Sequence, residues 1–78
     1  MRIIREFPFS ERIKASVFSW NGKYILKLES GSLEQTYKIP EMDLSSLDEL
    51  LDYCRNEVFR DAVNQAFASM ESAWPPES

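Results

Sequence analysis

The sequence contains no histidine, one cysteine and only two glycines in 78 residues. Histidine is the usual general base near neutral pH and the commonest nitrogen ligand of metals, so the chain lacks the residue that most often performs these two roles. A lone cysteine cannot form a disulfide or a zinc site of several thiolates within one chain. Neither glycine lies in a phosphate-binding motif. We therefore expect a protein that is not an enzyme and that holds no metal and no cofactor.

Long hydrophobic runs are also missing. No segment approaches the stretch of about 18 apolar residues that a membrane-spanning helix requires. The first residues, MRIIREF, include three charged side chains, whereas a signal peptide has an apolar centre. A single cysteine fits a reducing compartment. These features predict a cytoplasmic protein without a membrane partner.

Basic runs are absent as well. Lys and Arg are scattered, and Asp and Glu outnumber them, so the formal net charge is -4. An acidic balance disfavours nonspecific attraction to a phosphate backbone, which makes nucleic acid a poor candidate partner. Hydrophobic residues make up 44% of the chain, enough for a packed core. Because a chain this short buries only about 60% of its unfolded surface, we expect a single domain, residues 1–78, that gains stability as a homodimer.

The strongest local signal is the run WNGK. Asn-Gly is the pair that best adopts the two positive φ angles of a type I′ turn, and both flanking segments are rich in β-branched and aromatic residues. We predict strands at residues 13–20 and 23–30, paired so that Phe18 faces Ile25. Side chains alternate across a strand. One face of the hairpin then carries the core residues Ile13, Ala15, Val17, Tyr24, Leu26 and Leu28.

Three large apolar residues, Phe18, Trp20 and Ile25, fall on the opposite face of this hairpin. The N-terminal segment, with its two phenylalanines, or the C-terminal helix could fold over them and make a second small core. Alternatively they form an interface, because apolar patches with aromatic anchors are typical of interfaces. We favour the interface.

A second tight turn is predicted at SGS, followed by a strand over residues 33–39 that Pro40 ends. A loop made of the first two residues of SGS pairs Lys27 with Glu34, whereas a loop made of the last two sets Glu29 against Glu34. The first register pairs opposite charges, and we favour it.

Residues 2–7 are predicted to form a further short strand, which Pro8 confines to an edge or to a turn that leads into the hairpin. A helical pattern over residues 44–74 follows the strands. Several starts compete for it: Asp43 as N-cap with Met42 packed on Leu47 as a hydrophobic staple, or Ser46 as N-cap with Glu49 completing a capping box. The fold class is therefore α+β, an antiparallel three- or four-stranded meander followed by a C-terminal helix, continuous or broken into two, packed on one face. That face carries Ile13, Val17, Leu26, Leu28, Tyr37 and Ile39.

The apolar residues of the helical region form two stripes about 130° apart around a helix axis. The first comprises Leu47, Leu50, Leu51, Cys54 and Val58, and the second comprises Phe59, Ala62, Val63, Ala66, Phe67, Met70 and Trp74. One straight helix cannot direct both stripes at one flat sheet. Either the chain breaks and Asn56 caps a second helix, or the second half of the helical region packs on something else, such as a symmetry mate.

Cys54 and two carboxylate pairs are the remaining candidates for chemistry. Cys54 lies on an apolar stripe without a histidine to activate it, so we interpret it as an inert buried thiol. Glu49 with Asp52, and Glu57 with Asp61, have helical spacings at which carboxylates can bind a divalent ion or act as acid and base. Because arginines are interleaved with them, we interpret these carboxylates as a solvated helix face.

Two resemblances add to this interpretation. The run WNGKYILKLESGSLEQTYKIPEMDL resembles small bacterial proteins of the Bacteroidetes type, a family without an assigned activity. The stretch SVFSWNGKYILKL is similar to the single-stranded-DNA-binding domain of the positive transcription coactivators, a curved antiparallel sheet followed by a dimerising helix. That resemblance implies base stacking by Trp20 and backbone contacts by Lys23, Lys27 and Lys38. Two features do not fit this resemblance: two glutamates lie on the same predicted sheet, and the net charge of the chain is negative.

These inferences predict a non-enzymatic homodimer that acts as a binding or regulatory module. Its candidate interface residues are Phe18, Trp20, Ile25, Phe67, Met70 and Trp74. Single-stranded nucleic-acid binding by the sheet is the alternative function.

Overall fold

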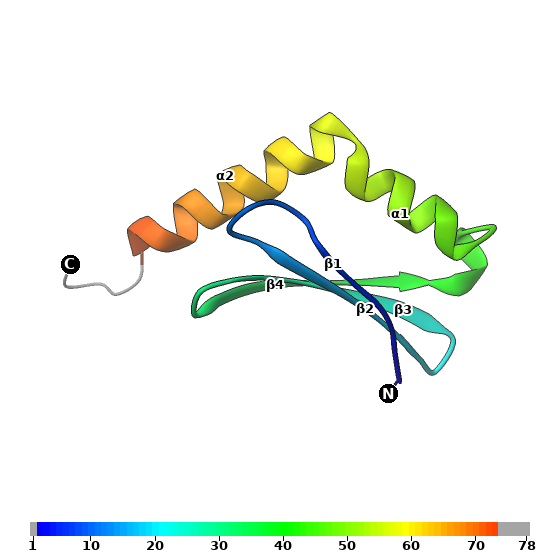
Figure 1. Ribbon diagram of the computed structural model, residues 1–78. Coiled ribbons are helices and arrows are strands. Elements are labelled where there is room, and N and C mark those ends of the chain that lie inside the picture. The colour runs from blue at the N-terminus through cyan, green and yellow to red at the C-terminus, as the bar shows by residue number, and fades with distance from the viewer. Residues whose placement is uncertain (1, 74–78) are drawn as a thin grey trace.

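The computed structural model describes residues 2–73, which form a two-layer α+β structure (Figure 1). Four strands make an antiparallel meander in the order β1-β2-β3-β4. These strands are β1 (Arg2–Pro8), β2 (Lys14–Trp20), β3 (Lys23–Ser30) and β4 (Leu33–Pro40). A short 3-10 turn, η1 (Glu41–Asp43), leads to the helices α1 (Leu47–Arg55) and α2 (Glu57–Ala73). The two helices arch over one face of the sheet, so the predicted fold class is confirmed.

The β2–β3 hairpin has the predicted register. Asn21 and Gly22 have φ angles of 54° and 76°, the positive values that a type I′ turn needs at both loop positions. Phe18 lies opposite Ile25, as the length of the loop requires. The predicted separation of the two faces follows from this pairing.

The favoured register of the β3–β4 hairpin is wrong. The loop is Gly31-Ser32, so Glu29 lies opposite Glu34. Gly31 has a φ of 62°, and glycine at the first position of a two-residue loop is typical of a type II′ turn. Lys27 Nζ still reaches Glu34 Oε2 at 3.6 Å, diagonally across the strands. Because this ion pair forms in the observed register too, the backbone requirement for glycine decides the pairing.

Strand β1 is an edge strand, as predicted, and it carries a bulge. Its register with β2 shifts between Ile3 and Arg5, which makes Ile4 the extra residue. Before the bulge, Ile3 lies opposite Phe18. This pair faces away from the helices, on the side of the sheet that we call the open face.

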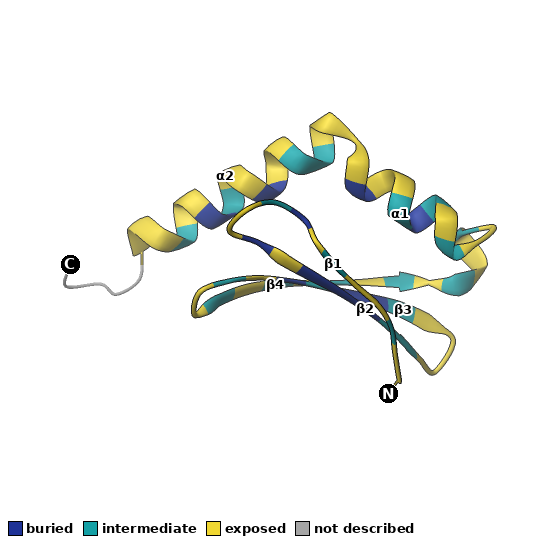
Figure 2. Cartoon of the chain, viewed as in Figure 1, coloured by how far each residue is buried: buried dark blue, intermediate teal, exposed yellow. Residues whose placement is uncertain are grey.

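The hydrophobic core lies between the sheet and the helices (Figure 2). Its buried members are Phe9, Ile13, Ala15, Val17, Leu26, Leu28, Leu50, Cys54, Val63 and Phe67. Tyr24, Tyr37 and Ile39 are partly buried and pack against them. The predicted core face is confirmed. Phe9 belongs to this core, so it does not fold over the open face.

The helical region breaks at Asn56, which has the extended angles φ -69° and ψ 128°. Its Oδ1 accepts hydrogen bonds from the backbone N–H of Val58 at 2.9 Å and of Phe59 at 3.2 Å. These bonds satisfy two of the free donors at the start of α2. Of the two predicted alternatives, the structure therefore shows the one in which the helical region is broken into two helices.

Each helix turns its own apolar stripe toward the same core because of this break. The buried residues are Leu50 and Cys54 from α1, and Val63 and Phe67 from α2. Val58, predicted for the first stripe, is 78% exposed, since it lies beyond the break.

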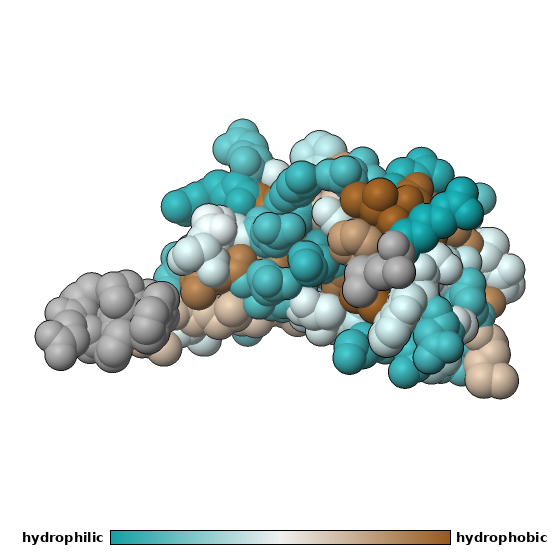
Figure 3. Space-filling view, turned by 90° about the horizontal axis from the view of Figure 1, so that it is seen from below, coloured by the Kyte–Doolittle hydropathy of each residue, from teal (hydrophilic) through white to brown (hydrophobic). Residues whose placement is uncertain are grey.

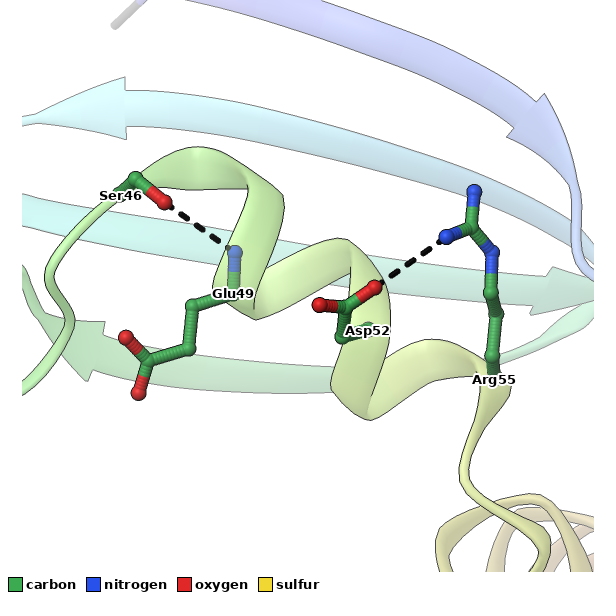
Figure 4. Close-up of polar contacts among 4 residues, drawn as sticks. All are labelled: Ser46, Glu49, Asp52 and Arg55. Carbon is green, nitrogen blue, oxygen red and sulfur yellow. Dashed lines mark hydrogen bonds and ion pairs between the residues drawn. The ribbon is translucent and has the colours of Figure 1, made fainter.

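The second of the two predicted caps starts α1. Ser46 Oγ accepts the N–H of Glu49 at 3.4 Å (Figure 4). The Glu49 carboxylate accepts the N–H and the hydroxyl of Ser45, so the return bond of the capping box is shifted by one residue. Asp43 lies in η1 and Met42 is exposed, so the start at Asp43 is wrong.

Candidate binding surfaces

The first candidate surface is the apolar end of the open face, next to the Asn-Gly turn. Strand alternation places Phe18 and Trp20 from β2 on this face together with Ile25 from β3, and the bulge adds Ile3 from β1. Seen from the sheet side, a hydrophobic area lies at this end of the molecule amid mostly hydrophilic atoms (Figure 3). No other part of residues 2–73 covers it.

These four residues, which we call the hairpin patch, differ in accessibility. Trp20 is 48% exposed and Ile3 is 46% exposed, while Phe18 is half-buried. Ile25 is only 5% exposed, although it lies outside the main core. Neighbouring side chains of the same face therefore cover Ile25, and it offers little surface to a partner. The sequence did not indicate Ile3, because the bulge that positions it left no recognisable signal.

Charges of both signs occupy the rest of the open face. Lys14 Nζ lies 2.9 Å from Glu6 Oε2, and this hydrogen bond is the main cause that raises the pKa of Lys14. Lys27 pairs with Glu34, and its Nζ lies 5.6 Å from the centre of the Phe18 ring. Two of the basic residues on this face are thus matched by acidic neighbours.

The second stripe predicted as an interface is not a free surface. Phe67 is 4% exposed and belongs to the core, and Met70 is half-buried against that core. Trp74 lies outside the described residues. The break at Asn56 lets α2 lie along the sheet, so this chain's own core uses the stripe that a symmetry mate was expected to cover. The assignment of Phe67 to an interface is therefore corrected.

The second candidate surface is an apolar groove of about 530 Å³ below the bend between α1 and α2. Its lining has no charged residue and includes Tyr37 and Ile39 from β4. Tyr53 and Val58 line it from the helix side and are 53% and 78% exposed. The sequence pattern did not indicate this groove, because it exists only where the broken helix rises from the sheet.

The cysteine and the carboxylate that were candidates for chemistry lie in surroundings typical of structural residues. Burial raises the pKa of the Cys54 thiol, and the nearby Arg60 and Arg55 offset this only in part. Asp52 forms an exposed ion pair with Arg55 at 3.2 Å (Figure 4). Within residues 2–73, no three His, Cys, Asp or Glu side chains are grouped so that they could hold a metal ion.

Comparisons with models of protein families, with curated proteins and with solved structures found no match. None of the helices in residues 2–73 is long and apolar enough to cross a membrane.

Proposed function

We propose that the protein is a non-enzymatic, cytoplasmic binding module, and that it forms a homodimer through the open face. The hairpin patch carries this proposal. It exposes about half of Ile3 and Trp20 on a face that no other described segment covers. Exposed apolar patches with an aromatic anchor are typical of interfaces. A two-fold axis would bury the patch of each subunit against the open face of the other.

The size of the open face sets the expected strength of the dimer. Strands of seven or eight residues extend about 25 Å and lie about 4.8 Å apart, so four of them present about 500 Å². Two such faces would bury about 1,000 Å², which is at the low end for a specific interface. We therefore expect a dimer that dissociates on dilution.

The charges of the open face are compatible with self-association. Lys14 is paired with Glu6 and Lys27 with Glu34, so this part of the face has no single dominant sign. Over the whole open face, the strands place four lysines against three glutamates: Lys14, Lys23, Lys27 and Lys38 against Glu6, Glu29 and Glu34. These charges nearly balance, so two copies can approach without the repulsion of a strong field of one sign.

Light scattering over about a hundredfold range of concentration tests the proposal. We expect the mass of the wild-type protein to rise from monomer to dimer, and the Trp20→Ser variant to remain monomeric. Tyr53→Ser is the matched control, because Tyr53 has a similar exposure but lies at the groove. A wild-type monomer at every concentration would refute the dimer. Dissociation by Tyr53→Ser alone would place the interface at the groove instead.

A specific observation also favours the alternative of single-stranded nucleic-acid binding. Lys23 and Lys38 lie beside the hairpin patch, opposite Trp20 and Ile25, and neither forms an ion pair within residues 2–73. An aromatic side chain with free cations around it can stack a base and contact the backbone. Fluorescence anisotropy with a labelled oligonucleotide at low salt tests this function. Absence of binding at tens of micromolar protein would eliminate it.

A further inference from the structure

A second pocket, separate from the open face, lies where β1 meets the end of α1 and the first turns of α2. Its volume is about 300 Å³. Arg5 approaches it from β1, Arg55 from the last turn of α1 and Arg60 from α2. Phe7, Pro8, Leu51 and Cys54 complete its lining.

The charge of this pocket differs from that of the whole chain. The protein has nine Lys and Arg residues and a net charge of -4, yet three arginines and no carboxylate line this one pocket. Arg5 forms no ion pair within residues 2–73. Arg55 is paired only with Asp52, on an exposed surface where an ion pair is weak and easily exchanged. Positive charge has therefore been concentrated here without a partner that fully neutralises it.

The third arginine is held in place by the fold. Arg60 donates to the carbonyl oxygen of Phe9 at 2.5 Å and to that of Cys54 at 3.2 Å. Its guanidinium also lies over the Phe9 ring, 4.2 Å from the ring centre. A guanidinium has five N–H donors, and these two bonds leave others free. Arg60 is thus a fixed donor beside two arginines that can move.

We propose that this arginine pocket binds a small molecule that carries a phosphate group. Planar guanidinium groups match phosphate oxygens in geometry, and three of them suit a dianionic group better than a single carboxylate. The apolar side chains of Phe7, Pro8 and Leu51 can contact a compact organic body attached to the phosphate. The volume is at the lower limit for ligand sites, which are about 300–1,000 Å³. The small volume of the pocket limits the site to small ligands. The proposal is independent of the homodimer, because the pocket lies on the helix side of β1.

Calorimetric titration with phenyl phosphate tests this site, and benzoate serves as the matched carboxylate. We expect phenyl phosphate to bind and benzoate to bind at least about tenfold more weakly, because the carboxylate carries less charge. In the NMR spectrum of the wild-type protein, the amide signals that shift should be those of Leu51, Cys54, Arg55 and Arg60. No heat and no shifts at about 10 mM phenyl phosphate would overturn the proposal, as would equal binding of the two ligands.

Two double variants distinguish the effect of the pocket on phosphate binding from the effect of the net charge of the protein. Arg5→Gln with Arg55→Gln should weaken phenyl phosphate binding by about a hundredfold, that is, about tenfold for each lost guanidinium. Arg2→Gln with Arg12→Gln changes the net charge equally outside the pocket and should leave the affinity within about twofold of the wild type. An equal loss in both double variants would show a general charge effect and overturn the site. Arg60 is left unchanged, because it also holds the fold together.

Discussion

Asn56 ends one helix and begins the next, and it determines where the second apolar stripe goes. Its backbone adopts extended angles, and its side chain accepts two N–H groups of α2. With this cap, both helices can lay their apolar sides on one sheet. A single continuous helix would have left Val63 and Phe67 directed away from the core that they now share with Leu50 and Cys54.

Substitution of Asn56 tests this role. Asn56→Ala removes both capping bonds and should lower the free energy of unfolding by about 1 kcal/mol, the usual cost of losing an N-cap. Asn64→Ala makes the same chemical change inside α2, where alanine is the better helix former, and should be neutral or slightly stabilising. Urea unfolding measures both variants. Equal losses would mean that the cap contributes nothing specific.

Glu49 gives a prediction about pH. The Ser45 hydroxyl, and then the Ser45 N–H, donate to the Glu49 carboxylate and hold the pKa of that carboxyl below its ordinary value. A carboxyl with a lowered pKa stabilises the fold above its ordinary pKa, and this contribution is lost as the pH falls through the lowered value. Glu49 therefore stabilises α1 at neutral pH and stops doing so in acid.

An NMR titration of the Glu49 carboxyl carbon checks this cause. Ser45→Ala removes the hydroxyl and should move the pKa of Glu49 upward toward its ordinary value, while Ser69→Ala, on the exposed side of α2, should leave it unchanged. If the pKa of Glu49 is the same in the Ser45→Ala variant as in the wild type, the hydrogen bond is not the cause of the shift.

At the scale of elements, local backbone chemistry was readable in the sequence and long-range geometry was not. Asn-Gly fixed the β2–β3 hairpin because few other pairs accept two positive φ angles. Charge pairing predicted the wrong register for the β3–β4 hairpin, because the Lys27 side chain is long enough to reach Glu34 in the observed register as well. The groove and the arginine pocket are lined both by residues of β1 or β4 and by residues of the helices. These residues are far apart in the sequence, so no local sequence pattern predicts that they lie together. The bulge that turns Ile3 to the open face likewise has no local signature.

Gly31 provides a test of the backbone conformation of the β3–β4 loop. Gly31 has a φ of 62°, so Gly31→Ala should cost about 1 kcal/mol of unfolding free energy, since an alanine side chain is strained at positive φ. No atom lies close enough to obstruct the new methyl group, so the loss comes from backbone strain and not from a steric clash. Ser32→Ala, at the other loop position, should change stability by less than about 0.5 kcal/mol. A Gly31→Ala variant as stable as the wild type would contradict the observed loop.

At the scale of the whole molecule, the helices cover only one of the two faces of the sheet. The described core is small, and the open face keeps Ile3 and Trp20 accessible to water. A second copy would bury this patch and supply the hydrophobic stabilisation that a chain of 78 residues has difficulty obtaining alone. The proposed dimer would thus bury the patch that the monomer leaves exposed.

The most direct test of that dimer is an isotope-filtered NMR experiment on an equimolar mixture of labelled and unlabelled protein at about millimolar concentration. We predict intermolecular contacts between the Ile3 methyl groups of one subunit and the Trp20 indole of the other, and their loss in the Trp20→Ser variant. A spectrum without intermolecular contacts from the open face would contradict the account, and contacts confined to Tyr53 and Val58 would contradict it equally.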